Sequence, residues 1–127
     1  MAVLKRLTKR SDFLRVQRAN LKYVTTSLVI QSASNSSLGH TATRVGFTAS
    51  KKIGNAVSRN FAKRRMRALI SRQSDTLVEA TDYVVIARQA ILVKKFSDIE
   101  GEMIDAIRAL NKKMLLRNTD IKPNSSN

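Results

Sequence analysis

The sequence of 127 residues contains no cysteine and only one histidine, His40. Without cysteine the chain can form neither a disulfide framework nor a thiolate metal site, and a catalytic relay built on cysteine or on several histidines is excluded. Acidic residues are also scarce, because nine Asp and Glu stand against 24 Lys and Arg, for a formal net charge of +15. A chain with so large a positive charge is expected to bind a polyanion.

Long apolar runs are absent as well. The first seven residues already include Lys5 and Arg6, so they do not form the core of a secretory signal peptide, and no later segment approaches the length of a membrane span. We therefore expect a cytoplasmic protein with no membrane partner. The length suits one domain with a single hydrophobic core, expected over residues 1–117. Residues 118–127 are polar, include the only proline and are expected to form a flexible tail.

Positive charge is concentrated in the first half of the chain. No acidic residue lies between Asp12 and Asp75, whereas that stretch contains 12 Lys and Arg. Most acidic residues lie further along the chain, where they can form local ion pairs or occupy the first turns of helices. The first half is thus expected to carry the binding surface and the second half to serve mainly as scaffold.

Hydrophobic periodicity predicts three strands. The run from Tyr23 to Ser32 is rich in β-branched residues and alternates near its end, which favours a strand. A polar turn cluster separates it from a second strand at 43–49, so the two are expected to pair as an antiparallel hairpin with a long loop. The third strand, at 82–88, is continuously apolar, as expected for a strand covered on both faces.

Three helices are predicted around these strands. A short helix is expected at 11–16, and a long helix at 56–72 with Asn55 as its N-cap. The last helix begins with a capping-box sequence at 97–100 and runs to about Leu116. The order helix, strand, strand, helix, strand, helix indicates an α/β (α+β) two-layer sandwich, with helices against one small central sheet. The apolar stripe of the last helix consists of Ile99, Met103, Ile107, Leu110 and Met114.

The first long helix carries a row of cations. Arg59, Lys63 and Arg67 recur at every fourth residue and share one face, with Asn60 and Arg64 beside them. Such a row suits a nucleic-acid backbone, because Arg offers a planar fork to phosphate oxygens and Lys adds a mobile charge. Asn60 can also donate to a sugar or a base edge.

The segment in front of this helix adds further donors. Lys51 and Lys52 precede Gly54 and Asn55 at the helix N-terminus, where free N–H groups and the helix dipole attract phosphate. Strand end, turn and helix start are expected to form one anion site. Arg65 points away from the row and could reach a second part of a large ligand.

Charge alone leaves several functions open. A basic helix face can be merely solvated, and a membrane-surface role is disfavoured because the helix lacks a broad apolar face. A protein nuclease acting alone would need a metal-carboxylate or histidine site, for which the acids are too scattered. A ribosomal-type or general RNA-chaperone protein shares the charge. Phe13 is equally compatible with base stacking and with core packing.

The run from Arg44 to Arg67 resembles the signature of the bacterial ribonuclease P protein subunit. It contains Lys-Lys, Gly-Asn-Ala-Val, Arg-Asn and Lys-Arg in the order and at the spacing of that family, an order that an RNA chaperone does not need. The order of elements from Leu4 to Leu116 extends the resemblance. Phe61 departs from the family pattern, which usually has Arg there, and Arg65 one turn later could partly replace that contact.

This resemblance implies a fold, an activity and partners. The fold is a central mixed sheet with helices and a left-handed βαβ crossover around the basic helix. The activity is that of an endoribonuclease in which an RNA subunit, using magnesium ions, removes the 5′ leader of precursor tRNA. The protein assists as a subunit and is not expected to be active alone. The implied partners are the RNA subunit and precursor tRNA, with no obligate protein partner and no organic cofactor.

The resemblance also implies two binding regions. In the family the basic helix region faces the catalytic RNA, and a concave sheet face with the first helix receives the single-stranded leader. Gln17 stands where many members place a second aromatic, so stacking on the leader is expected to be weaker here. Carried over by position, the contacts to the RNA subunit are Lys51, Lys52, Asn55, Arg59, Asn60, Lys63, Arg64, Arg65 and Arg67, and the leader cleft comprises Phe13, Val16, Gln17, Val29, Gln31, Thr48 and Ser50.

Overall fold

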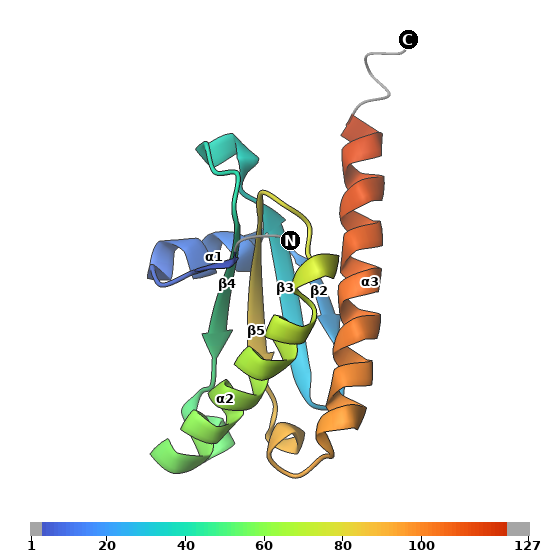
Figure 1. The fold of residues 1–127 in the computed structure, drawn as a ribbon. Coiled ribbons are helices and arrows are strands. Elements are labelled where there is room, and N and C mark those ends of the chain that lie inside the picture. The colour runs from blue at the N-terminus through green and yellow to red at the C-terminus, as the bar shows by residue number, and fades with distance from the viewer. Residues whose placement is uncertain (1–3, 122–127) are drawn as a thin grey trace.

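One mixed sheet of five strands, in the order β1-β4-β5-β3-β2, forms the centre of the molecule (Figure 1). The computed structural model describes residues 4–121, with side chains through residue 117. β4 runs parallel to both β1 and β5, whereas β3 runs antiparallel to both β5 and β2. The elements are β1 (Leu4–Arg6), α1 (Arg10–Arg18), β2 (Leu21–Val24), β3 (Leu28–Ser34), β4 (Thr43–Thr48), α2 (Ala56–Arg72), β5 (Thr81–Ala87) and α3 (Phe96–Ile121), with short 3-10 turns η1 (Ser36–Leu38), η2 (Lys51–Ile53), η3 (Ser74–Thr76) and η4 (Gln89–Leu92).

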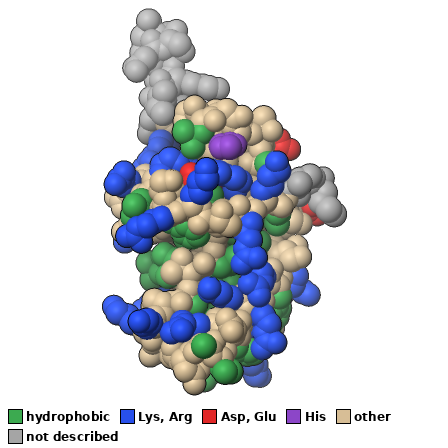
Figure 2. Space-filling model, turned by 90° about the vertical axis from the view of Figure 1, so that its left-hand side faces the viewer, with side chains coloured by type: hydrophobic (Ala, Val, Ile, Leu, Met, Phe, Trp, Pro, Cys, Tyr) green, Lys and Arg blue, Asp and Glu red, His purple; other side chains and the backbone are tan. Residues whose placement is uncertain are grey.

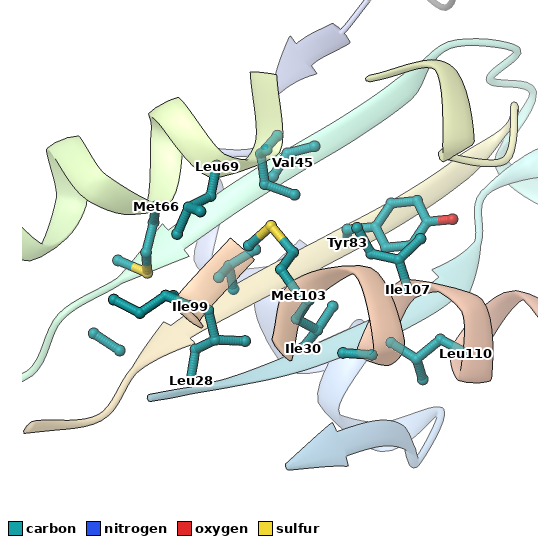
Figure 3. Packing of buried hydrophobic residues seen from close by; sticks show 14 of the residues in the cluster. Leu28, Ile30, Val45, Met66, Leu69, Tyr83, Ile99, Met103, Ile107 and Leu110 are labelled. Atoms are coloured by element: carbon teal, nitrogen blue, oxygen red, sulfur yellow. The ribbon is translucent and has the colours of Figure 1, made fainter. Parts of the chain in front are cut away.

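The main hydrophobic core lies between one face of the sheet and helices α2 and α3 (Figure 3). Met66 and Leu69 of α2 and Met103 of α3 are fully buried there against strand residues such as Ile30 and Tyr83. A smaller cluster on the opposite face joins Val16 of α1 to Val84 and Ala33 of the sheet. The predicted fold class is therefore confirmed, with α1 covering part of the second sheet face.

The long helices agree with their sequence patterns. All five residues of the predicted apolar stripe of α3 are buried in the main core, which confirms the stripe. The helix ends later than predicted, because it continues past Leu116 to Ile121. Extending an existing helix adds one backbone hydrogen bond per residue without new nucleation, so polar residues can continue it. Of the predicted tail, residues 122–127 lie outside the described part of the chain.

The predicted strand from Tyr23 to Ser32 is instead two strands, β2 and β3, joined by a tight turn. The Thr25 hydroxyl oxygen accepts a hydrogen bond from the Leu28 N–H at 3.1 Å, and the Thr25 N–H donates to the Leu28 carbonyl at 2.8 Å. A threonine side chain that bonds the backbone in this way competes with continued strand pairing. Periodicity alone missed this turn because Val24, Thr25 and Thr26 are all β-branched and continue the strand-like composition through it.

The predicted hairpin between the 23–32 run and the 43–49 strand is wrong. β5 lies between β3 and β4 and pairs with both of them, so Val85 stands opposite Ile30 on one side and Phe47 on the other. β5 is buried on both faces, as predicted. Because the most apolar strand takes the centre of the sheet, β5 lies between β3 and β4 and prevents them from pairing. The short strand β1 was also missed, because three residues carry no recognisable period.

Helix α2 connects two adjacent parallel strands, β4 and β5, as a βαβ unit. That this crossover is left-handed stays a prediction from the resemblance. Within residues 4–121 no helix combines the length and the apolar character that a membrane span requires.

A buried tyrosine ties β5 to α3. The Tyr83 hydroxyl donates to Asn111 Oδ1 at 2.8 Å and accepts from the Val78 N–H at 3.0 Å. Burial raises the pKa of Tyr83 to about 12, so the phenol keeps its proton at neutral pH. Tyr83→Phe is expected to lower the free energy of unfolding by about 1–3 kcal/mol in urea titrations, because both partners lose their hydrogen bond. Tyr23→Phe is the control, since the Tyr23 hydroxyl has no hydrogen-bond partner among the described residues, and an equal loss in both variants would contradict the assignment.

Candidate nucleic-acid interface

The predicted contacts to RNA lie on η2 and on α2. We call them the basic surface: Lys51, Lys52, Asn55, Arg59, Asn60, Lys63, Arg64, Arg65 and Arg67. Figure 2 shows Lys and Arg side chains in a column on the right-hand side of the view, the side on which α2 lies. Acidic side chains are few on this face of the molecule.

A glycine and an asparagine start α2. Gly54 has a φ of 144°, which L side chains rarely adopt, and a Cβ there would lie 3.1 Å from the Ser58 Cβ. Asn55 then caps the helix, because its Oδ1 accepts a hydrogen bond from the Ser58 N–H at 2.9 Å. The predicted cap is confirmed. The Asn55 side chain therefore has a structural role, with its amide N–H groups left to face a ligand.

The cationic row of α2 has no acidic counterpart. Arg59 donates to the Gly54 carbonyl at 3.2 Å, which holds the guanidinium beside the helix start. Lys63 is half-buried and Arg67 is exposed, and the row borders the buried face of the helix, which consists of Ala62, Met66, Leu69 and Ile70. Across residues 4–117, the ion pairs involve Arg15, Arg44, Arg72 and Lys94, and none involves the basic surface. Its charges are therefore available to an external polyanion.

Arg65 differs from the rest of the basic surface. Its guanidinium donates to the Ile91 carbonyl at 2.9 Å and to the Lys94 carbonyl at 2.7 Å. It also lies 5.0 Å from the centroid of the Phe61 ring. The protein itself holds this guanidinium on the η4 side of α2 through two backbone carbonyls, so Arg65 is not free to replace the contact of an arginine at position 61.

The predicted leader cleft lies on the sheet face opposite to the main core. Strand register places Val29, Ile86 and Thr48 in one row across β3, β5 and β4. The next row contains Gln31, Val84 and Gly46. The structure thus brings Val29 and Gln31 of β3 together with Thr48 of β4, across β5, in a mixed apolar and polar surface beside α1.

Phe13 of α1 lies directly over this sheet face. A Cβ on Gly46 would come within 2.5 Å of the Phe13 Cζ, so only glycine allows the ring to approach so closely. Phe13 is half-buried and shares a hollow of about 330 Å³ with Thr8, Arg10 and Thr48. The ring therefore packs against the smaller core and also borders an open space.

The other two predicted cleft residues of α1 lie differently. Val16 is fully buried in the smaller core, so it supports the cleft from below and offers no surface to a ligand. The reason is that Val16 lies one turn from Phe13 on the side of α1 that meets the sheet. Gln17 is exposed.

A larger hollow connects the cleft with the basic surface. It measures about 850 Å³ and lies where β4 and β5 end. Ser50 and Lys52 line it from one side and Ile86 and Arg88 from the other. Sequence reasoning missed Ile86 and Arg88, although the alternation along β5 places Ile86 on the same face as Val84.

A buried ionic network fixes α1 to the sheet. The Asp82 carboxylate is fully buried and accepts hydrogen bonds from Arg44 at 2.7 and 2.8 Å, from Asn35 at 2.7 Å, and from Arg15 of α1. The hydrogen bond to Asp82 raises the pKa of Arg44 further above its usual value. This network was not predicted, because its members are separated by up to 67 residues in the chain.

The protein offers no cage for a metal ion within its described residues, where no group of three or more His, Cys, Asp or Glu side chains is placed to bind one. The residues of the basic surface and of the cleft are cationic, amide, hydroxyl or apolar. Cationic and amide groups suit phosphate oxygens, whereas Mg²⁺ is bound mainly by carboxylate oxygens, water and substrate phosphates.

Comparison with known proteins identifies the family. The family model described as Ribonuclease P matches residues 1–111. The chain belongs to the ribonuclease P protein family. The ribonuclease P protein component of Paramagnetospirillum magneticum is 40% identical over 110 residues, which cover 84% of this chain and 83% of the relative. That of Citrifermentans bemidjiense is 38% identical over 108 residues, which cover 85% of this chain and 90% of the relative.

Solved structures of the ribonuclease P protein family share the fold. An RNase P protein mutant of Staphylococcus aureus with defective mRNA degradation activity superimposes with a TM-score of 0.73 at 28% identity, covering 84% of this chain and 87% of that one. The Thermotoga maritima RNase P protein gives a TM-score of 0.68 at 25% identity, covering 80% and 93%. The chain is thus a ribonuclease P subunit in tRNA 5′ processing, and the general RNA-chaperone alternative is not favoured.

Proposed function

We propose that this chain binds the RNA subunit of ribonuclease P through the basic surface and receives the 5′ leader of precursor tRNA in the sheet cleft. The observation that carries this proposal is the hollow of about 850 Å³ that both regions share through Ser50 and Lys52. No acidic side chain lines this hollow among the described residues, so an RNA chain that passes through it towards the cations of η2 meets no repulsive charge in its lining.

In this mechanism the protein assists by electrostatics and leaves the chemistry to RNA. Lysine and arginine side chains neutralise phosphates where the RNA subunit and the leader converge, which lowers the repulsion between the two RNA strands. Cleavage, including the magnesium ions it uses, is assigned to the RNA subunit. The half-buried Phe13 ring offers a stacking surface for a leader base at the edge of the cleft.

Reconstitution tests this proposal. Precursor tRNA is incubated with the purified protein, with the cognate RNA subunit, or with both, and the 5′ end of the product is mapped. We expect cleavage at the mature 5′ end only in samples that contain the RNA subunit, and the highest rate with both components. Cleavage by the protein alone, or an RNA subunit whose rate is indifferent to the protein, would overturn the proposal.

Phe13→Leu separates stacking from packing at the cleft. Leucine keeps most of the apolar volume over Gly46, so the cost in stability should stay below about 1.5 kcal/mol. It removes the aromatic face, so holoenzyme affinity for precursor tRNA is expected to fall by about 1 kcal/mol or more, as measured by equilibrium binding. Mature tRNA, which has no leader, is the control and should bind equally to both holoenzymes. An equal loss for both ligands would place Phe13 in the core alone.

A further inference from the structure

An aromatic ring lies within the otherwise cationic surface of α2. Phe61 is half-buried, and the guanidinium carbons of Arg65 and Arg64 lie 5.0 and 5.9 Å from the centroid of its ring. Both distances are within the range of cation–π attraction. The ring is thus surrounded by positive charge on a helix that the proposed function places against RNA.

The two arginines are held differently. Arg65 is anchored from the protein side by the carbonyls of Ile91 and Lys94, which fixes it against the ring. Arg64 is exposed and has neither a hydrogen bond nor an ion pair with the described residues, so only the ring contact holds it. Arg64 can therefore move away from the ring at little cost, whereas Arg65 keeps the ring in place.

Proteins stack unpaired bases on aromatic rings that have cationic side chains beside them, and Phe61 with its two arginines has this arrangement. The ring supplies a flat apolar surface for the base, and neighbouring guanidinium groups add stacking and phosphate contacts. A helix that contacted only duplex phosphates would gain nothing from an aromatic residue in this position, because the ring has no group that binds phosphate.

We propose that Phe61, held by Arg65 and flanked by Arg64, is a stacking site for an unpaired base of the ribonuclease P RNA subunit. This inference rests on the proposed function of the basic surface. The family resemblance leads one to expect an arginine at position 61. In this chain the position would instead contribute a stacking contact, which salt does not screen.

Equilibrium binding of the protein to its cognate RNA subunit, over a series of salt concentrations, tests the site. Phe61→Leu is expected to weaken binding about 5- to 150-fold, with the slope of log affinity against log salt unchanged. Phe61→Arg is expected to make that slope steeper by roughly 0.7 to 0.9, the contribution of one added phosphate contact. Phe61→Tyr keeps the ring and should bind like the unmodified protein.

Phe96→Leu is the matched control. Phe96 is also half-buried and has a guanidinium 5.9 Å from its ring centroid, but that group belongs to Arg72, which is paired with Glu100 away from the basic surface. This variant should bind the RNA subunit with unchanged affinity. Circular dichroism and urea unfolding verify that each variant is folded. If Phe61→Leu does not fold, Phe61→Met, which fills a similar volume, replaces it in the same comparison.

The outcomes separate this inference from the proposed function. If the unmodified protein binds the RNA subunit and folded Phe61→Leu binds equally well, the stacking site is wrong and the proposed function stands. A weaker affinity accompanied by a shallower salt slope would also overturn the stacking site, because Phe61 would then act by positioning the arginines. If the unmodified protein does not bind the RNA subunit, both fail.

Discussion

Replacing Asp82 with asparagine is expected to lower the free energy of unfolding by about 3 kcal/mol, measured by urea unfolding at neutral pH. The Asp82 carboxylate is fully buried and accepts hydrogen bonds from Arg44, Arg15 and Asn35. In either orientation an asparagine amide would turn its NH2 group towards two of these donors, and it would leave Arg15 without its carboxylate and Arg44 with only the longer contact to Asp12 at 3.4 Å. The Arg15 and Arg44 side chains are 28% and 14% exposed, so water offsets part of the loss and the lower end of the range for buried ion pairs applies.

Asp75→Asn is the matched control for this change. Asp75 is exposed in η3, outside every ion pair among the described residues, so the same chemical replacement there should alter stability by less than about 0.5 kcal/mol. Similar losses of unfolding free energy in both variants would mean that the Asp82 network stabilises the fold no more than any single negative charge does.

Because Asp82 fixes α1, which carries Phe13, the holoenzyme with Asp82→Asn should also bind precursor tRNA less tightly while retaining its affinity for mature tRNA.

The double substitution of Arg59→Ala with Lys63→Ala is expected to weaken binding to the RNA subunit by about 30- to 150-fold, if each lost phosphate contact contributes about 1 to 1.5 kcal/mol. The slope of log affinity against log salt should become shallower by about 1.5, because two counterion-releasing contacts are lost. Neither side chain belongs to the buried face of α2, so the fold should persist. Filter binding at several salt concentrations gives both quantities.

Lys112→Ala with Lys113→Ala removes the same charge from a different place. Both lysines are exposed on α3 and take part in no ion pair within the described residues. This double substitution is expected to reduce affinity for the RNA subunit only slightly, because it weakens the long-range electrostatic field of the protein. Equal effects of the two double variants would show that the net charge of +15 drives binding without a defined surface, and an unchanged affinity for Arg59→Ala with Lys63→Ala would move the interface elsewhere.

Local features of the chain were predictable because their causes are local. Gly54 and Asn55 end one element and cap the next through contacts that span three or four residues, and the stripe of α3 follows from helix geometry alone. The cationic row of α2 follows in the same way from its spacing. The strand order did not follow, because the placement of β5 between β3 and β4 depends on which strand buries most apolar surface when all of them meet.

The residues of the candidate interface also differ in whether local sequence or distant contacts determine their position. Lys63 and Arg67 were identified correctly as members of one helix face, whereas the anchoring of Arg65 by Ile91 and Lys94 depends on a loop that lies more than 25 residues further along the chain. Burial of Val16 and the approach of Phe13 to Gly46 likewise depend on how α1 lies on the sheet. A side chain's neighbours across the fold decide whether it meets a ligand or the core.

The sequence by itself determined the large positive charge and its concentration on one helix, from which a polyanion partner was predicted, and its order from Lys51 to Arg67 indicated the family, because charge and spacing are properties of the chain alone. Only the tertiary structure decided that Asp82 locks α1 over the cleft, that one hollow joins the cleft to the basic surface, and that Phe61 is held by an anchored arginine. These features arise from contacts between residues distant in sequence. Such contacts exist only when the helices have packed on the sheet and excluded water from its two faces.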